Sequence, residues 1–250
     1  MKILGIDVGG SGIKGALVNS KNGEMLTKRH RIPTPQPAKP DAVGDTIAEI
    51  AAHFDWDGPI GCTFPAIIKN GVAYSASNVH KSWIGTDVAK LVKKKTGCPA
   101  VALNDADAAG LCEMTFGAGK GVEGTVLTLT FGTGIGSGMF VDGTLVPNTE
   151  LGHLKWKGYT KVEAWAASKV RTEEDLSWAE WAERANAYLQ HVEFLFSPDL
   201  FILGGGVSNE KKRDNWMPLL DLNTPIEPAQ FGNHAGIIGA AMAAYREKKR

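Results

Sequence analysis

Two glycine-rich segments follow short apolar runs, and their composition suits the binding of phosphate. The first reads Asp7-Val-Gly-Gly-Ser-Gly-Ile-Lys14 and the second reads Phe131-Gly-Thr-Gly-Ile-Gly136. Because glycine has no Cβ, consecutive backbone N–H groups in such segments can point into one concavity that receives phosphate oxygens. The Asp7 carboxylate also suits a hydrated Mg²⁺ ion, whereas the second segment offers only the hydroxyls of Thr130 and Thr133. Two ordinary hairpin turns are the alternative, and the recurrence of the pattern weighs against it.

Carboxylates that could handle hydroxyl groups lie in two further places. Asn104-Asp105 follows an apolar run at the expected carboxyl end of a strand, where open α/β sheets place their ligands. Asp105 could take a proton from a substrate hydroxyl while Asn104 fixes the substrate, and capping of the next helix is the alternative role of Asp105. Glu150-Leu-Gly-His153 and Glu163 could hold the hydroxyls of a polyhydroxylated ligand, with a metal site or ordinary surface charges as alternatives.

The elements that position these residues are indicated by apolar runs and by the glycines and prolines between them. Strands are expected at 3–6, 14–19, 24–31, 59–64, 100–103, 125–131 and 199–203. Helices are expected at 41–54, 85–96, 106–115, 173–196 and 235–246, the first capped by Asp41 and the fourth by Thr172. The order of strand, glycine turn and strand occurs in both halves of the chain, which predicts a two-lobed α/β protein with an internal duplication.

Composition and charge exclude several classes of protein. The 250 residues include 27 Lys and Arg against 27 Asp and Glu, which argues against a surface that binds nucleic acid or anionic membrane as a whole. The three cysteines form no Cys-x-x-Cys pair, and no window approaches about 18 apolar residues, so we expect a reduced, cytoplasmic protein. The sequence lacks the motifs GxxxxGK[ST], HExxH and GxSxG, and no GxGxxG leads from an expected strand into an expected helix. P-loop nucleotidases, zinc proteases, nucleophile-elbow hydrolases and dinucleotide dehydrogenases are therefore not indicated.

Five motifs, taken in order, resemble those of the ROK family of sugar kinases. They are the segment 7–14, Asn104-Asp105-Ala-Asp-Ala-Ala109, Gly132-Thr-Gly-Ile-Gly136, Glu150-Leu-Gly-His153 and Phe201-Ile-Leu-Gly-Gly-Gly-Val-Ser208. The resemblance implies the two-lobed, actin-like and hexokinase-like ATPase fold with a duplicated, ribonuclease H-like α/β core. It also implies a small α/β domain at 1–108, completed by a C-terminal helix at 236–250, and a large α/β domain at 109–235.

The resemblance implies a role for each motif residue. Asp105 would be the general base that deprotonates the 6-hydroxyl of glucose. The remaining hydroxyls would be held by Asn78, Asn104, Glu150, His153 and Glu163. Mg²⁺ would bind through Asp7, and the donor phosphates would bind Asp7, Gly9, Gly10, Ser11, Gly12, Lys14, Gly132, Thr133 and Gly134, with Gly204, Gly205 and Gly206 at the far end of the donor. The family also suggests a homodimer.

One departure from the common family pattern bears on the phosphate donor. Many members carry zinc-binding cysteines between the motif histidine and the later glutamate, but the window 154–162 contains no cysteine, so we expect no zinc. This window, together with Gly61-Cys-Thr-Phe-Pro65 and Asn78-Val-His-Lys-Ser-Trp83, resembles the members that phosphorylate glucose from polyphosphate. Strict use of ATP and catalytically silent sugar binding are the alternatives. No helix-turn-helix is expected ahead of the fold, because its first strand begins at residue 3.

A polyphosphate donor would need cationic side chains that lead away from the phosphate-binding segments. Since the net charge is zero, those cations must be concentrated locally. The candidates are Lys14, Lys81, Lys93, Lys94, Lys95, Lys120, Lys155, Lys157 and Lys161. A solvated helix or loop face is the alternative for each of them, favoured for Lys93–Lys95 and weaker for Lys155 and Lys157, which replace the zinc-binding segment.

Overall fold

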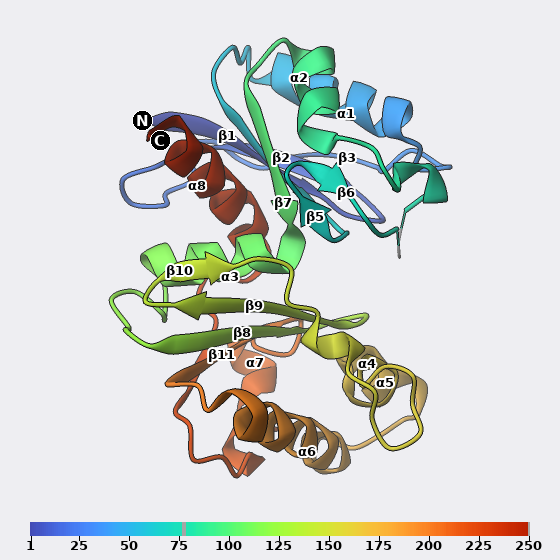
Figure 1. The fold of residues 1–250 in the computed structure, drawn as a ribbon, viewed down its shortest axis with the longest axis vertical. Coiled ribbons are helices and arrows are strands. Elements are labelled where there is room, and N and C mark those ends of the chain that lie inside the picture. The colour runs from blue at the N-terminus through green and yellow to red at the C-terminus, as the bar shows by residue number, and fades with distance from the viewer. Residues whose placement is uncertain (77–78, 250) are drawn as a thin grey trace. The chain divides into compact units, whose positions relative to one another are not determined.

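The structure is a computed structural model that describes residues 1–76 and 79–249 (Figure 1). The chain forms two compact units. One consists of Met1–Cys112 together with the segment from His234 onward, and the other consists of Glu113–Asn233. Each unit is built around a five-stranded mixed sheet, and α3 (Asp105–Phe116) contains the boundary between the units.

The sheet of the first unit has the strand order β3-β2-β1-β4-β7. β1, β2 and β3 form an antiparallel meander, whereas β4 and β7 continue the sheet parallel to β1. All residues of β4 are buried, as expected for a strand that is covered on both faces. The bounds are β1 Lys2–Val8, β2 Ile13–Asn19, β3 His30–Ile32, β4 Ile60–Phe64 and β7 Ala100–Asn104, with β5 Ile68–Lys69 and β6 Val72–Ala73 as a separate ribbon.

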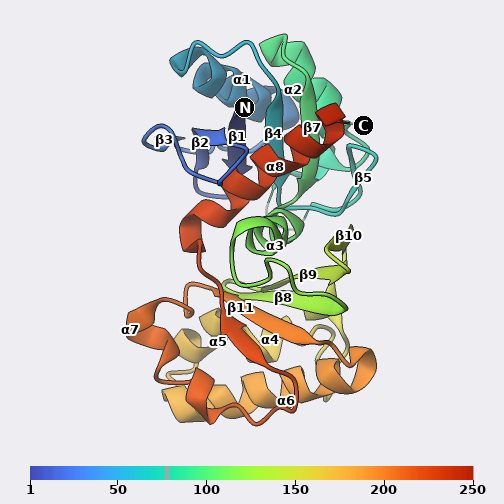
Figure 2. The ribbon, with the colours of Figure 1, turned by 90° about the vertical axis from the view of Figure 1, so that its left-hand side faces the viewer.

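Helices cover both faces of this sheet (Figure 1, Figure 2). α8 (Ala235–Lys249) crosses β1, β4 and β7 on one face, while α1 (Pro40–His53) and α2 (Val88–Thr96) lie on the other. A Cβ on Gly5 would meet the backbone carbonyl of Ile237, and a Cβ on Gly61 would meet that of Ala240. These strand glycines are therefore required by the close approach of the α8 backbone.

The second unit repeats the same sheet topology, with the order β10-β9-β8-β11-β12. Again three antiparallel strands are followed by two parallel ones, so the predicted duplication of the α/β core is confirmed. Its core is aromatic, because Phe131 lies within 6.3 Å of the rings of Trp181, Tyr188 and Trp216. The bounds are β8 Thr125–Phe131, β9 Ile135–Val141, β10 Thr144–Val146, β11 Leu200–Gly205, β12 Ile226–Pro228, α4 Glu163–Ala166, α5 Ser168–Glu173, α6 Trp178–Phe196 and α7 Glu210–Arg213.

The helix expected at 173–196 begins later, and its expected cap at Thr172 is wrong. α6 begins at Trp178, because the Ser177 hydroxyl accepts from the Glu180 N–H while the Glu180 side chain accepts from the Ser177 N–H. This reciprocal capping box satisfies two backbone donors that would otherwise lack partners. The residues ahead of it form the separate helices α4 and α5.

Two other expected boundaries differ from the structure. The strand expected at 24–31 is reduced to β3, because Met25 makes only an isolated bridge to Val18. Asp41 lies in the first turn of α1 rather than at its cap, since Pro40 already takes the first helical position. Proline suits that position because its missing N–H would have had no partner there.

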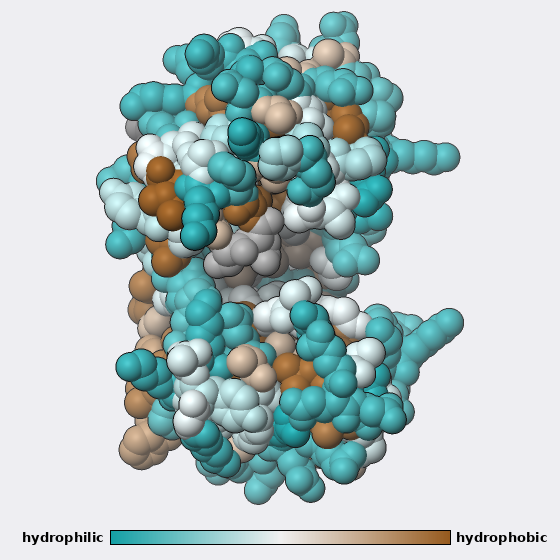
Figure 3. Space-filling view, turned by 90° about the vertical axis from the view of Figure 1, so that its right-hand side faces the viewer, coloured by the Kyte–Doolittle hydropathy of each residue, from teal (hydrophilic) through white to brown (hydrophobic). Residues whose placement is uncertain are grey.

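The molecular surface shown in Figure 3 is mostly hydrophilic, and its hydrophobic residues form small separate groups. The most exposed large hydrophobic side chain is Phe194 on α6, at 81% exposure. In residues 1–76 and 79–249, no helix combines the length and the apolar character that crossing a membrane would require.

The close packing of α8 on the sheet predicts a large cost for a single added methyl group. Gly61→Ala should lower the free energy of unfolding by about 1–3 kcal/mol, because the new Cβ overlaps the α8 backbone. Gly44→Ala in α1 is the matched control, since its Cβ meets only side-chain atoms of Lys95 and Leu91 and alanine favours the helix. Urea unfolding followed by circular dichroism measures both. Equal stability of the two variants would contradict the close approach.

Candidate functional site

The first glycine segment is the turn between β1 and β2. The Gly9 N–H donates to the Gly12 carbonyl at 3.1 Å, which closes the turn. At the end of β1, Asp7 Oδ1 accepts from the Thr63 hydroxyl at 2.9 Å, and Asp7 Oδ2 lies 3.4 Å from the Lys14 ammonium. The Asp7 side chain is 20% exposed. The structure thus holds one accessible carboxylate at the mouth of a glycine turn.

Side chains of residues 31–36 occupy three consecutive carbonyl groups of this turn. The Thr34 hydroxyl donates to the Gly9 carbonyl at 2.5 Å, and the Gln36 amide donates to the Gly10 carbonyl at 3.5 Å. The Arg31 guanidinium donates to the Ser11 carbonyl at 2.9 Å. Across the described residues, no acceptor is bonded to the N–H groups of Gly10, Ser11 and Gly12. The turn therefore has satisfied carbonyls and available N–H donors, which is the arrangement that an anion requires.

Asn104 and Asp105 lie at the carboxyl end of β7, as expected. Asn104 is buried, and its Oδ1 accepts from the N–H groups of Ala106 and Asp107 while its amide donates to the Ala66 carbonyl. Asn104 therefore caps α3. Asp105 is exposed, although its Oδ1 also accepts from the Ala106 N–H at 2.9 Å.

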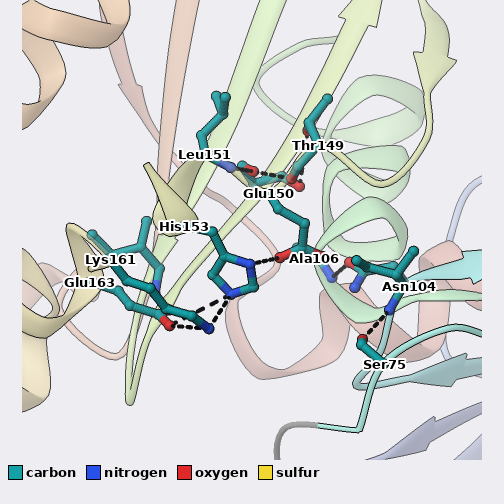
Figure 4. Close-up of polar contacts among 12 residues, drawn as sticks. Ser75, Asn104, Ala106, Thr149, Glu150, Leu151, His153, Lys161 and Glu163 are labelled. Carbon is teal, nitrogen blue, oxygen red and sulfur yellow. Dashed lines mark hydrogen bonds and ion pairs between the residues drawn. The ribbon is translucent and has the colours of Figure 1, made fainter. Parts of the chain in front are cut away.

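The second group of carboxylates gathers around His153 in the second unit (Figure 4). His153 ends the short 3-10 helix Leu151–His153, Glu150 precedes that helix, and Glu163 begins α4. His153 Nδ1 lies 3.5 Å from Glu150 Oε2, and His153 Nε2 lies 3.6 Å from Glu163 Oε1. Lys161 Nζ completes the cluster, at 2.9 Å from His153 Nε2 and 3.4 Å from Glu163 Oε1.

Whenever the His153 ring is neutral, Lys161 fixes which of its nitrogens carries the proton. An ammonium group only donates hydrogen bonds, so His153 Nε2 accepts and the ring proton lies on Nδ1. That proton faces the Glu150 carboxylate. Sequence reasoning considered Lys161 only as a contact for the donor, whereas the structure places it among the residues expected to hold the sugar.

Glu163 also contacts the second glycine segment, the turn between β8 and β9. Glu163 Oε2 accepts from the Ile135 N–H at 3.2 Å, and a Cβ on Gly134 would collide with the same oxygen. The Gly132 carbonyl accepts from the Ser168 hydroxyl at 3.1 Å and from the Lys169 N–H at 3.0 Å. The backbone of this turn is therefore fixed by the segment that also carries the Glu163 carboxylate.

The third glycine run follows β11. Gly205 has a φ of 93° and a Cβ there would overlap the backbone of Phe131, so only glycine fits. The Gly205 carbonyl accepts from the Ser208 hydroxyl at 2.9 Å, and the Gly206 carbonyl accepts from the Lys212 ammonium at 3.3 Å. As in the first turn, side chains occupy the carbonyls of the glycine backbone.

The cysteine-free window 154–162 forms a small hairpin with an isolated bridge between Trp156 and Tyr159. Lys157 lies over the rings of Trp156 and Trp165, at 5.3 and 5.0 Å from their centroids. Aromatic stacking and cation–π contacts thus hold this segment. Among residues 1–76 and 79–249, no group of three or more His, Cys, Asp and Glu side chains could hold a metal ion.

The expected site residues divide between the units. Asp7, the 9–12 turn, Lys14, Asn104 and Asp105 belong to the first unit, and the others that the structure describes belong to the second. Asn78 lies outside the described residues. Sequence reasoning missed the hydrogen bonds of Thr63, Arg31, Thr34 and Gln36. These side chains reach Asp7 and the first turn through strand pairing and through the path of the chain between β3 and α1.

Comparison with known proteins identifies the family of the chain. Residues 3–164 match the model of the ROK family. The chain is 50% identical over 242 residues to a polyphosphate glucokinase of Mycobacterium tuberculosis, covering 96% of this chain and 90% of that protein. The chain belongs to the ROK family. A glucokinase of Streptomyces coelicolor is a more distant relative, with 28% identity over 95% of this chain and 96% of its own length.

Solved structures of other ROK proteins show the same fold. The inorganic polyphosphate/ATP-glucomannokinase from Arthrobacter sp. strain KM superposes with a TM-score of 0.90 at 49% identity, covering 98% of this chain and 99% of that one. A ROK family glucokinase from Streptomyces griseus, crystallised with glucose and AMPPNP, gives a TM-score of 0.80 at 24% identity over 98% and 100% of the two chains. The fold is thus the actin-like ATPase fold of the ROK sugar kinases, as the sequence predicted.

The environment of Glu150 predicts how its charge affects stability. Burial raises the pKa of the Glu150 carboxyl above its ordinary value; His153 and Lys161 oppose this effect, and the neighbouring Glu163 carboxylate adds to it. A raised pKa in the folded state means that ionisation of Glu150 costs stability once the pH exceeds the ordinary glutamate value, and that this cost vanishes below it.

Glu150→Gln should therefore raise the free energy of unfolding at neutral pH and have little effect near pH 3, because both states carry the proton more than one unit below the ordinary glutamate pKa of about 4.3. Urea unfolding of the variant and the native protein at the two pH values measures the difference. A loss of stability at neutral pH that disappears at the lower pH would mean that the attraction of Glu150 to His153 and Lys161 outweighs burial.

Proposed function

We propose that this protein is a polyphosphate glucokinase, which transfers a phosphoryl group from inorganic polyphosphate, and also from ATP, to the 6-hydroxyl of glucose. The observation that carries the proposal is the 50% identity to a polyphosphate glucokinase over 96% of this chain. The similarity to a polyphosphate/ATP-glucomannokinase at 49% identity supports the use of both donors.

Asp105 is the general base in this proposal. Its exposed carboxylate takes the proton of the glucose 6-hydroxyl, and the resulting oxygen attacks the terminal phosphorus of the donor. The bond from that phosphorus to the bridging oxygen breaks, which releases a polyphosphate that is one phosphate shorter, or ADP from ATP. The buried Asn104 fixes the base by capping the helix that begins with Asp105. Positioning and charge neutralisation supply most of the catalysis in phosphoryl transfer.

The remaining glucose hydroxyls are assigned to Asn78, Asn104, Glu150, His153 and Glu163. Support comes from the cluster in which His153 links the two glutamates, since carboxylates accept hydrogen bonds from hydroxyl groups in fixed directions. Lys161 orients this cluster rather than the donor, because its ammonium lies against His153 and Glu163.

The donor phosphates are assigned to the two glycine turns and to the third glycine run. The residues are Asp7, Gly9, Gly10, Ser11, Gly12, Lys14, Gly132, Thr133, Gly134, Gly204, Gly205 and Gly206. Support comes from the available N–H groups of the first turn and from side chains that occupy glycine carbonyls in all three segments.

Asp7 fits a Mg²⁺ ion, because its carboxylate is fixed by Thr63 and remains partly exposed beside the first turn. Mg²⁺ usually binds proteins through one or two carboxylates and completes its shell with water and substrate phosphates. When bound, the ion neutralises the charge of the donor phosphates. No zinc is expected in the window 154–162, which has no cysteine. A cytoplasmic homodimer that binds neither nucleic acid nor membrane completes the proposal.

The alternatives are a strictly ATP-dependent glucokinase and a silent sugar-binding protein, and a donor comparison separates all three. Purified protein should form glucose 6-phosphate from long-chain polyphosphate in the presence of Mg²⁺. Raising the salt concentration should weaken the apparent affinity for polyphosphate steeply and that for glucose little, because polyanion binding releases counterions. Activity with ATP alone would leave an ATP-dependent kinase, and no transfer from either donor would leave a binding protein.

Asp105→Asn tests the general base. The amide keeps the shape of the side chain but cannot accept the hydroxyl proton, so kcat should fall by about 10²–10⁴-fold or more. Glucose binding, measured by calorimetry, should persist in weakened form. The control is Asp142→Asn, an exposed aspartate of the β9–β10 turn, which should keep kcat within about twofold. Near-native turnover of Asp105→Asn would remove the assignment.

A further inference from the structure

Arg31 is the cation next to the first glycine turn that has no carboxylate partner. Its guanidinium donates to the Ser11 carbonyl at 2.9 Å, and a Cβ on Gly12 would lie 2.5 Å from its Nε. Gly12 therefore leaves room for the guanidinium as well as for a ligand. None of the ion pairs formed within residues 1–76 and 79–249 involves Arg31, and its side chain is exposed.

Strand register places Arg31 in a row with the metal-site carboxylate. Asp7 of β1 pairs with Lys14 of β2, and Lys14 pairs with Arg31 of β3. Side chains of directly opposed residues on antiparallel strands point to the same face of a sheet, so the three lie side by side. Asp7 and Lys14 form an ion pair at 3.4 Å, which leaves one uncompensated positive charge, on Arg31.

Three of the cations suggested by the sequence are held by other groups. Lys95 is bound by Asp41 and Asp45 at 3.3 and 2.6 Å. Lys161 belongs to the His153 cluster, and Lys157 lies over aromatic rings. Arg31 keeps further N–H donors in a planar fork, which is the geometry that binds phosphate in bidentate fashion.

We propose that Arg31 binds a donor phosphate at the first glycine turn and is a principal determinant of affinity for inorganic polyphosphate. The inference rests on the proposed function, because it takes the 9–12 turn as a donor site. The ligand class is a linear polyanion of phosphates. The available N–H groups of residues 10–12 bind one phosphate group, and the guanidinium fork beside them binds an adjacent one.

Arg31→Gln tests the proposal through polyphosphate binding. The KM for long-chain polyphosphate, and its dissociation constant measured without glucose, should both rise about 10- to 100-fold, the usual effect of losing a charge-assisted hydrogen bond. The slope of the logarithm of the dissociation constant against the logarithm of the salt concentration should fall by about 0.7–0.9, the contribution of one phosphate contact. Arg31→Lys, which keeps the charge but loses the fork, should be intermediate in affinity and keep the salt dependence. The KM for glucose should stay within about twofold, since the sugar is neutral.

Two controls distinguish the effect of the Arg31 charge on polyphosphate from its effect on the structure of the first turn. Lys28→Gln removes an exposed cation of the same connector and should leave polyphosphate binding unchanged. Gln36→Ala removes a neutral donor to the Gly10 carbonyl, so it should not alter the salt dependence. If Arg31→Gln behaves like Lys28→Gln, or weakens binding with unchanged salt dependence, the proposal is overturned. If the native protein transfers no phosphate to glucose, the proposed function fails, and the binding measurements without glucose still decide the role of Arg31.

Discussion

A turn that binds anions through its backbone must keep its N–H groups free and its carbonyl groups occupied. Peptide groups that find no partner are costly, and a free carbonyl near the site would repel phosphate. In this protein, side chains from outside each glycine segment donate to its carbonyls, Arg31, Thr34 and Gln36 at the first turn and Ser168 at the second. The surrounding connectors are thus as important to these turns as the glycines themselves.

The cationic side chains near the candidate site differ in whether other groups of the protein hold them. Two lysines of the candidate site are engaged by other groups, because Lys14 forms an ion pair with Asp7 and Lys157 lies over the ring of Trp165. Arg31, by contrast, donates to a backbone carbonyl and forms no ion pair within residues 1–76 and 79–249. A zero net charge is therefore compatible with a local excess of positive charge beside the first glycine turn.

The positions of the glycine turns and of Asp105 could be predicted from the sequence, because each follows a short run of apolar residues typical of a buried strand. It misled at the start of α6, where Thr172 with Asp175 imitates a capping box and Ser177 with Glu180 forms one. The support of the first turn by Arg31 could not be predicted, since it depends on the register of β2 and β3. The contact of Lys161 with His153 likewise depends on a hairpin whose turn, with Lys157 at a φ of 45°, has no clear sequence signal.

The assembly of the first sheet from both ends of the chain has a consequence for folding. α8 covers β1, β4 and β7, yet it follows the whole second unit in the chain. During synthesis, the apolar face around Gly5 and Gly61 stays uncovered until residues 235–249 have left the ribosome, while the second unit already has its complete set of strands. The first unit to be made is therefore the last to be completed, and its sheet lacks the cover of its own helix in the meantime.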